Sequence, residues 1–379
     1  MKILRLKFIL KKIFSESIYA KIRFFVNSFF WRIKLKFNKK IDQQPQIKRE
    51  RGFIVNGIID NYFSYHLRPK KNKDFYLRSI PTSFNKKNGI IIQGNIGKNY
   101  EFLKETLKFY KKIFPDNIVI VSTWENEDVI KLKKLEEKNI KIIINKLPTS
   151  KSPGNTDLQI ITTSSGLRLA DKLGLEFCLK QRADIRIYKN DLLLYMEALI
   201  KNYPLKIKTQ YKNRIISTSL NTLKYRLFSL SDFLLYGNTK DLLIYFNELS
   251  YKKSLLKYEF GSEPCFIEGT PIQAEIFLCA RYLSNDLGKV TFDLDFWWQS
   301  LKDYFCIVDS NSIDFIWAKY DYDIEHRFYK SYSNEFSRCI EFSDWLILYN
   351  DCEKNWKKFM ADHERYDEKY SLLNNNFSN

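Results

Sequence analysis

The chain has 379 residues, of which 45% are hydrophobic, enough to build one large domain with extensions or two fused domains. With only 12 Gly and 9 Pro residues, long disordered tracts and repeat arrays are disfavoured. The formal net charge of +19 indicates an anionic partner, and nucleic acid, anionic lipid and nucleotide diphosphates all qualify.

The cysteines and the apolar runs bear on the cellular compartment. The six cysteines form no C-x-x-C pair and most have apolar neighbours, which predicts free buried thiols rather than disulfides or a metal site. No apolar run reaches the roughly 20 residues of a membrane-spanning helix. Residues 1–10 are basic and apolar, but Lys11 and Lys12 interrupt them too early for a signal-peptide core.

The N-terminal 40 residues are strongly basic, because Glu16 is the one acidic residue against twelve Lys or Arg residues, with aromatic residues between them. This pattern predicts helices lying in a membrane interface, where each cation contributes about 1 kcal/mol near anionic headgroups. A helical pair packed on the main domain is the alternative. Residues 41–50 are polar, contain Pro45 and predict a linker, so we assign 1–50 to an arm and linker.

From residue 89 onward, buried-strand and amphipathic-helix patterns alternate along the chain. Such alternation predicts a parallel sheet with right-handed crossovers, in which ligands bind beyond the carboxyl ends of the strands. No G-x-G-x-x-G follows the first strand and no G-x-x-x-x-G-K-[ST] occurs, which disfavours dinucleotide oxidoreductases and P-loop NTPases. Strands are predicted at 89–94, 117–124, 140–145 and 176–188, and helices at 99–114, 128–138 and 155–173.

A series of short motifs follows these strands and their ends. They are IIIQGNI at 90–96, FYKKIFP at 109–115, VIVSTWE at 119–125, IIINK at 142–146, Asn155 with QIITT at 159–163, LKQRADIRI at 179–187, LNTLKYR at 220–226 and FSLSDFLLYG at 228–237. In their order and spacing these motifs resemble the WavE family of lipopolysaccharide-synthesis proteins. The resemblance implies an α/β, Rossmann-like GT-A fold that transfers a sugar from a nucleotide-diphosphate donor. It covers about residues 88–350 and implies one domain over 51–350, with a nucleotide-sugar half at 88–190, an acceptor half at 191–350 and a helical tail at 351–379.

The first strand ends supply candidates for binding the nucleotide. The resemblance implies that the Gly94 loop cradles the base and ribose, although a plain turn is the alternative. Trp124 could stack on a base, or it could anchor the edge of the core, and a carboxylate beside it could accept from ribose hydroxyls. The substrate-binding candidates here are Gln93, Gly94, Asn95, Thr123, Trp124, Glu125 and Asn145.

Asp184 lies where GT-A enzymes place a D-x-D motif, whose carboxylates hold a divalent ion that neutralises the leaving diphosphate. This sequence departs from the motif, because a single carboxylate stands between Arg182 and Arg186. In an extended segment all three side chains would lie on one side. We therefore expect either Mg²⁺ or Mn²⁺ at a catalytic Asp184, or neutralisation of the diphosphate by the two arginines. A structural ion cluster of the three residues is the alternative.

The remaining candidates belong to the acceptor side or to a helix start. Asn155 and Gln159 share one face of a helix start, where they could contact the donor or, for Asn155, cap the helix. Ser231 and Asp232 are expected near the acceptor, with a turn role as the alternative for Asp232. Glu275 is the expected catalytic base and Glu268 the second choice, although a first-turn acid also stabilises a helix dipole.

The function expected from these observations is sugar transfer to a lipid-linked saccharide at the inner membrane surface, by a cytoplasmic chain peripheral to that membrane. A sugar-nucleotide-processing enzyme such as a nucleotidyltransferase is one alternative. A basic nucleic-acid-binding protein is another, but we expect no nucleic-acid partner, because the sequence shows no recognition motif and the basic residues concentrate in the arm.

Overall fold

The computed structural model describes residues 68–74, 87–148, 155–224, 226–247, 274–291, 293–318 and 339–351. The chain divides into two compact units, Met1–Arg68 and Pro69–Asn379, and the description that follows concerns the second. The basic arm, the tail beyond residue 351 and Glu268 lie outside the described residues. Within those residues, no helix is both long and apolar enough to cross a bilayer.

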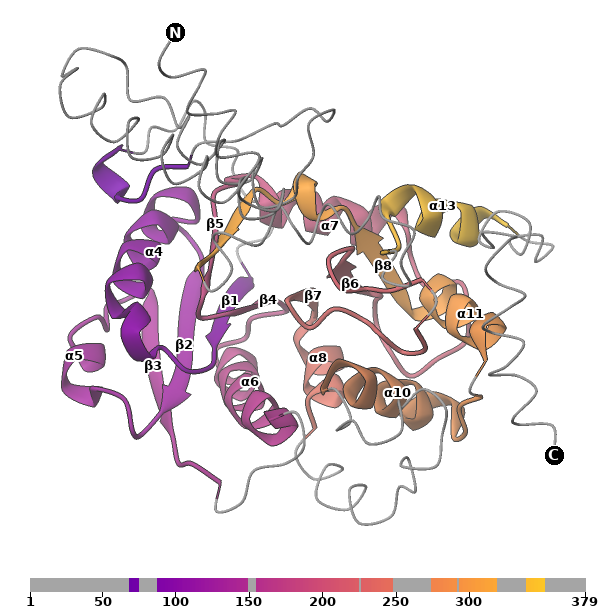
Figure 1. Cartoon of the computed structure of the whole chain (residues 1–379), viewed down its shortest axis with the longest axis horizontal. Coiled ribbons are helices and arrows are strands. Elements are labelled where there is room, and N and C mark those ends of the chain that lie inside the picture. The colour runs from indigo at the N-terminus through magenta and orange to yellow at the C-terminus, as the bar shows by residue number, and fades with distance from the viewer. Residues whose placement is uncertain are drawn as a thin grey trace, which may run out of the picture. The chain divides into compact units, whose positions relative to one another are not determined.

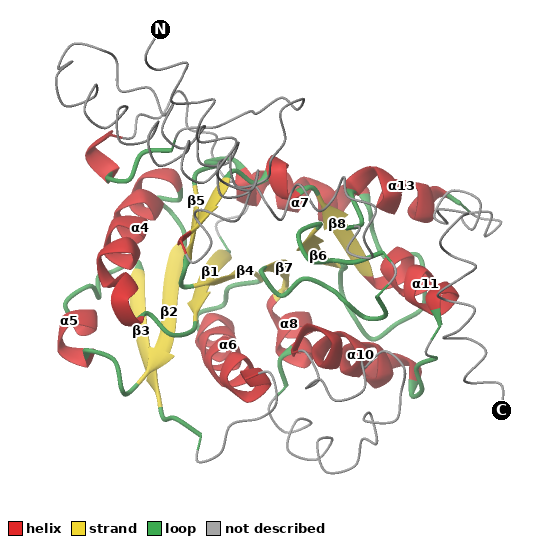
Figure 2. Cartoon of the chain, viewed as in Figure 1, coloured by secondary structure: helices red, strands yellow, loops and turns green. Residues whose placement is uncertain are grey.

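A seven-stranded sheet forms the centre of the second unit, in the order β3-β2-β1-β4-β7-β6-β8 (Figures 1 and 2). All neighbouring strands are parallel except β7, which runs antiparallel to both β4 and β6. A short β5 (Ile185–Ile187) pairs antiparallel with β9 (Phe315–Trp317) in a second sheet. The main strands are β1 (Asn88–Gln93), β2 (Ile118–Trp124), β3 (Ile140–Asn145), β4 (Phe177–Arg182), β6 (Ile215–Thr218), β7 (Leu234–Asn238) and β8 (Phe305–Val308).

The reversed β7 is a difference from the fully parallel sheet that the sequence predicts. A parallel neighbour needs a crossover, usually through a helix, whereas β6 and β7 are joined by residues 219–233 without one. The chain therefore returns directly beside β6. The prediction of parallel strands is confirmed for β1 to β4. Strands β1 to β3 match the expected ranges closely, whereas the strand expected at 176–188 is divided into β4 and β5, which belong to different sheets.

Helices cover both faces of the sheet. Figure 1 shows α6, α8 and α10 below it and α7 and α13 above it. The described helices are η1 (Asn72–Asp74), η2 (Gly97–Asn99), α4 (Tyr100–Ile113), α5 (Val129–Lys133), α6 (Thr156–Lys172), α7 (Leu192–Asn202), α8 (Thr239–Tyr245), α10 (Ala274–Leu287), α11 (Leu294–Tyr304), η5 (Ser310–Ser312) and α13 (Phe342–Asn350).

The faces can be told apart by the side chains of β4, which alternate between them. Cys178 contacts Thr239 at the start of α8, and the Lys180 ammonium lies 5.6 Å from the centre of the Phe246 ring at its end. Gln181 instead accepts a hydrogen bond of 2.6 Å from Tyr110 of α4. Helices α8 and α4 therefore cover opposite faces of β4.

Helix α6 crosses the sheet closely, because it presents Gly166 to β1 and β2. A Cβ at this position would lie 2.6 Å from Ile91 Cγ2 and 3.7 Å from Ser122 Cβ. The approach fixes α6 over β1 and β2 and carries the first turn of the helix towards the carboxyl ends of the strands. The prediction of free buried thiols is confirmed for Cys178, Cys279 and Cys306, whereas Cys339 is only half-buried.

Candidate functional site

Polar side chains gather where β4 ends, at the carboxyl edge of the parallel strands. Arg182 is the last residue of β4, and the backbone N–H of Ala183 still donates to Gln93 O of β1 at 2.9 Å. The chain then turns at residues 183 and 184 before β5 begins. Asp184 therefore lies at the sheet edge where ligands of open α/β sheets bind, as expected.

Asp184 and Arg182 form a bidentate ion pair. The Arg182 Nε and Nη2 atoms donate to the two carboxylate oxygens of Asp184 at 2.9 Å each. Trp317 of β9 donates from its indole Nε1 to Asp184 Oδ2 at 3.0 Å. Burial acts to raise the pKa of Asp184, but these hydrogen bonds and the guanidinium charge prevail and hold it below its ordinary value.

Arg186 corrects the expectation that all three side chains lie on one side. The turn at 183 and 184 breaks the alternation, and Arg186 contacts α4 instead. It is 2% exposed, and its nitrogens donate to Thr106 Oγ1, Phe102 O and Lys70 O at 2.9 Å each. Arg186 therefore holds α4 in place and is not available to a diphosphate, so the ion cluster contains one arginine.

Asp232 brings three separate elements together at the same edge. It lies just before β7, and the antiparallel register that pairs Gln181 with Leu234 places it beyond the end of β4. Gln159 of α6 donates to Asp232 Oδ2 at 2.6 Å, and Lys180 of β4 donates to the backbone carbonyl of Asp232. The structure thus brings Gln159 and Asp232 into direct contact.

Lys180 is a cation inside the sheet that the sequence interpretation missed. Its side chain is fully buried, and burial lowers the pKa of Lys180 to about 8, although the carboxylates of Asp232, Asp184 and Glu275 act to raise it. A buried ammonium is stabilised by opposite charge close to it. Lys180 therefore supplies the positive charge around which these carboxylates gather.

Glu275, in the first turn of α10, completes the group. Burial first, and then the Asp232 carboxylate, raise the pKa of Glu275, while Arg226 and Lys180 act in the opposite direction. The hydroxyl of Tyr245 on α8 is buried near both carboxylates and has no hydrogen-bond partner in the described structure. A carboxylate with a raised pKa beside a second one has the character of a proton acceptor in catalysis.

The loop after β1 has the backbone expected of a ligand-binding turn. Gly94 has φ +111°, and a Cβ there would meet nothing within 4 Å, so its space is open. Asn95 is exposed, whereas Gln93 is buried and accepts from Thr162 of α6 at 2.9 Å. Gly94 and Asn95 therefore face the open edge, and Gln93 joins β1 to α6.

The end of β2 is more buried than a nucleotide-stacking site requires. Trp124 is 3% exposed, which supports its alternative role as an anchor of the core. Asn145 donates to Ser122 Oγ and to Thr123 O, and Glu125 is exposed and accepts from the backbone N–H of Leu147 at 3.1 Å. The Thr123 hydroxyl is buried without a partner among the described residues.

Two further candidates are Asn155, which does not cap its helix through its side chain, and Ser231, which has a structural role. Asn155 is exposed with φ +55°, and its side chain makes no cap hydrogen bond, so its expected cap role is wrong. Ser231 is buried, with its backbone N–H bonded to Thr222 Oγ1 at 3.0 Å and its carbonyl to Ser217 Oγ at 2.8 Å. Ser231 therefore shapes the loop that presents Asp232.

Within the described part of the chain, the residues around Asp184 do not form a set of ligands that fits a divalent metal ion. Both of its oxygens accept from Arg182, and one accepts from Trp317 as well. Among the described residues, no group of three or more His, Cys, Asp or Glu side chains could hold a metal ion. Magnesium and manganese sites are built from oxygen ligands, which Asp184 offers here only to a guanidinium and an indole.

The sequence profile described as WavE lipopolysaccharide synthesis matches residues 89–370, more than half of the chain. The chain belongs to the WavE family. No curated protein matches this WavE-family sequence.

Two solved structures that match this WavE-family chain are only weakly similar to it. One is a protein assigned as a glucose-1-phosphate thymidylyltransferase from Bacillus anthracis, at 10% identity and a TM-score of 0.35, covering 66% of this chain and 96% of that one. Another is a glycosyltransferase involved in glycosylation of the major capsid of PBCV-1, at 13% identity and a TM-score of 0.27, covering 45% and 74%. Neither bears on function.

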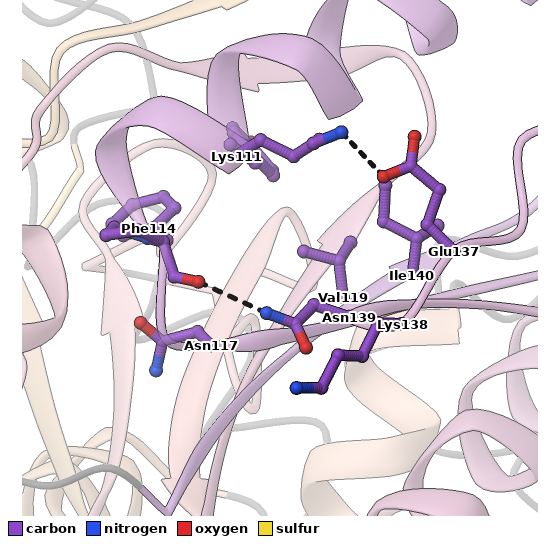
Figure 3. Close-up of a pocket in the computed structure, with 10 residues that line it drawn as sticks. Lys111, Phe114, Asn117, Val119, Glu137, Lys138, Asn139 and Ile140 are labelled. Atoms are coloured by element: carbon purple, nitrogen blue, oxygen red, sulfur yellow. Dashed lines mark hydrogen bonds and ion pairs between the residues drawn. The ribbon is translucent and has the colours of Figure 1, made fainter.

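A pocket of about 140 Å³ lies elsewhere in the WavE-family chain, between the end of α4 and the amino ends of β2 and β3 (Figure 3). The exposed pair Lys111 and Glu137 lies across it with 2.6 Å between Nζ and Oε2, and Asn139 donates to Pro115 O at 3.2 Å. The side chains of Lys111, Glu137 and Asn139 are thus already bonded within the lining of the pocket. This pocket lies at the strand edge opposite to the one that binds ligands in such sheets.

Proposed function

We propose that this WavE-family chain is a glycosyltransferase with a GT-A-like fold, which transfers a sugar from a nucleotide-diphosphate donor to a lipopolysaccharide or a related surface glycan. One observation carries the proposal. Gln159, Lys180, Asp232 and Glu275 come from four separate segments and meet at the carboxyl edge of the sheet. Family membership supplies the link to lipopolysaccharide synthesis.

The chemistry of sugar transfer assigns a role to each group. The acceptor oxygen forms a bond to the anomeric carbon, and the bond from that carbon to the diphosphate breaks, so that its electron pair leaves with the nucleoside diphosphate. The hydroxyl proton passes to Glu275, whose raised pKa suits a base. Asp232, with one oxygen bonded to Gln159, binds acceptor hydroxyls in this proposal.

The donor occupies the other half of the edge in this proposal. The open space above Gly94 and the exposed Asn95 suit the close approach of a nucleotide to the backbone. The basic arm at 1–50 keeps the enzyme at the anionic inner membrane surface, where a lipid-linked acceptor resides. The support for this attachment is the basic and aromatic sequence of the arm.

The test uses the full chain with a panel of nucleotide sugars and lipopolysaccharides of truncated glycan length. We expect release of a nucleoside diphosphate together with a glycan heavier by one sugar. The Glu275→Gln variant should lose this activity, and Glu101→Gln, which changes an exposed glutamate of α4, should retain it. Pyrophosphate release from a nucleoside triphosphate and a sugar phosphate would instead establish the nucleotidyltransferase alternative.

A further inference from the structure

The Arg182 guanidinium is held rigidly at the end of β4. Two hydrogen bonds of 2.9 Å join it to Asp184, and its central carbon lies 5.6 Å from the centre of the Trp317 ring. The Arg182 side chain is 32% exposed, whereas that of Asp184 is 10% exposed. The cation is therefore the partner that reaches the surface, with the carboxylate behind it.

Asp184 is itself fixed from β9. The Trp317 indole donates to Asp184 Oδ2, and the backbone N–H of Ala318 donates to Asp184 O at 2.8 Å. The ring of Trp317 lies 4.8 Å from that of Phe233, next to Asp232 in the chain. The arrangement thus orients a guanidinium beside the loop that carries Asp232.

Lys180 adds a second positive charge on the same face of β4. It precedes Arg182 by two residues, so the two side chains project from the same face of the strand. The two cations are close enough for Arg182 to act on the proton affinity of Lys180. The end of β4 therefore holds two cations, of which Lys180 is buried and Arg182 reaches the surface.

We propose that Arg182, oriented by Asp184 and Trp317, binds the diphosphate of the nucleotide donor, so that donor binding requires no divalent ion at Asp184. The proposal rests on the proposed glycosyltransferase function and replaces the ion expected from the sequence. A guanidinium matches phosphate oxygens bidentately, and an oriented one needs no rearrangement when negative charge develops on the leaving group. Asp184 is then a positioning residue.

The test is calorimetric binding of UDP, GDP, ADP, CDP and dTDP to the full chain, in EDTA and in Mn²⁺ or Mg²⁺. For the nucleotide that binds, we expect dissociation constants within about threefold of each other in the two conditions. Arg182→Ala should weaken binding by more than about tenfold. Arg168→Ala, which removes an exposed arginine of α6, is the matched control for lost charge and should bind normally.

Two variants separate orientation from charge. Arg182→Lys keeps the charge without the bidentate geometry, so we expect binding between that of the wild type and Arg182→Ala. Trp317→Phe keeps a ring but removes the N–H donated to Asp184, and it should weaken binding several-fold without creating a metal requirement. Circular dichroism and the melting temperature of each variant exclude loss of fold.

Binding that appears only with Mn²⁺ or Mg²⁺, and that survives Arg182→Ala, would overturn the inference and leave the glycosyltransferase proposal intact. If no nucleoside diphosphate binds in either condition, both proposals fall together.

Discussion

Gln159 donates to Asp232 Oδ2 at 2.6 Å although 73 residues separate the two in sequence. The bond joins the first turn of α6 to the loop that precedes β7. Because Lys180 also holds the backbone carbonyl of Asp232, the loop is fixed from both α6 and β4. The side of the site proposed to bind the acceptor therefore depends on elements of the side proposed to bind the donor.

Replacing Glu275 by Gln should reduce transfer by roughly 10²–10⁴-fold, the range for loss of a general base, without reducing stability. Burial raises the pKa of Glu275, so the ionised form is disfavoured in the folded state. That penalty is absent below the pKa of the unfolded chain and is fully present above the pKa of the folded one. Melting at pH 8 should show the variant equal to or more stable than wild type, with Glu101→Gln as control. A less stable variant that still turns over would contradict the assignment.

Lys180→Met should show a stability difference from wild type that changes with pH. The pKa of Lys180 falls from 10.5 to about 8 on folding, so its favourable contribution is present above 10.5 and is lost as the pH falls through about 8. The shift corresponds to roughly 3 kcal/mol. Urea unfolding between pH 7 and 10 should therefore show wild type gaining stability relative to the variant as pH rises. If the free energies of unfolding of wild type and variant changed equally with pH, Lys180 would not be buried as a cation.

Arg186→Leu should destabilise the fold by roughly 2–4 kcal/mol, because it removes three hydrogen bonds that the buried guanidinium donates. Their acceptors are Thr106 Oγ1, Phe102 O and Lys70 O. The same change at exposed Arg168 is the control and should cost little. Any loss of activity in Arg186→Leu should be proportional to the fraction of the protein that is unfolded. A variant that folds stably but binds nucleotide poorly would instead show that Arg186 belongs to the nucleotide-binding site.

Gly166→Ala should destabilise the fold by about 1–3 kcal/mol, the usual cost of overpacking. The new methyl group would lie 2.6 Å from Ile91 Cγ2 in the centre of the sheet. Ser165→Ala, one residue earlier on a less buried position of α6, is the control. Equal urea midpoints for the two variants would show that α6 can move away from β1 at little cost.

Deleting residues 1–50 should release the protein from anionic vesicles, because that segment carries the dense basic and aromatic pattern. Cosedimentation with vesicles at low and high salt measures the effect, and circular dichroism checks that the remainder still folds. Sedimentation of the truncated chain with vesicles in high salt would show that the anchor lies elsewhere.

The sequence predicts the first half of the sheet well, because β1 to β3 carry apolar runs bounded by turns, and such runs fit buried parallel strands. Asp184 could also be placed at the strand end from that pattern. The reversal at 183 and 184 could not, because Arg-Ala-Asp-Ile contains none of the Gly, Pro or Asn-Gly signals that mark a turn.

The partners of Lys180 and Asp184 could not be predicted from the sequence, for a different reason. Lys180 bonds a carbonyl 52 residues away, and Trp317 lies 133 residues from Asp184. No local pattern marks either pairing. A lysine inside the strand pattern Cys-Leu-Lys-Gln is the one available signal, because a cation in a buried strand needs a compensating partner.

The reversed strand β7 also affects how the chain must fold during synthesis. It bonds β4 on one side and β6 on the other, so the edge of β4 at Phe177–Gln181 stays open until residues 234–238 have left the ribosome. An unpaired strand edge is a template for pairing with other chains. The nascent segment that carries β1 to β4 therefore depends on the rest of the chain, or on a chaperone, to protect it from association.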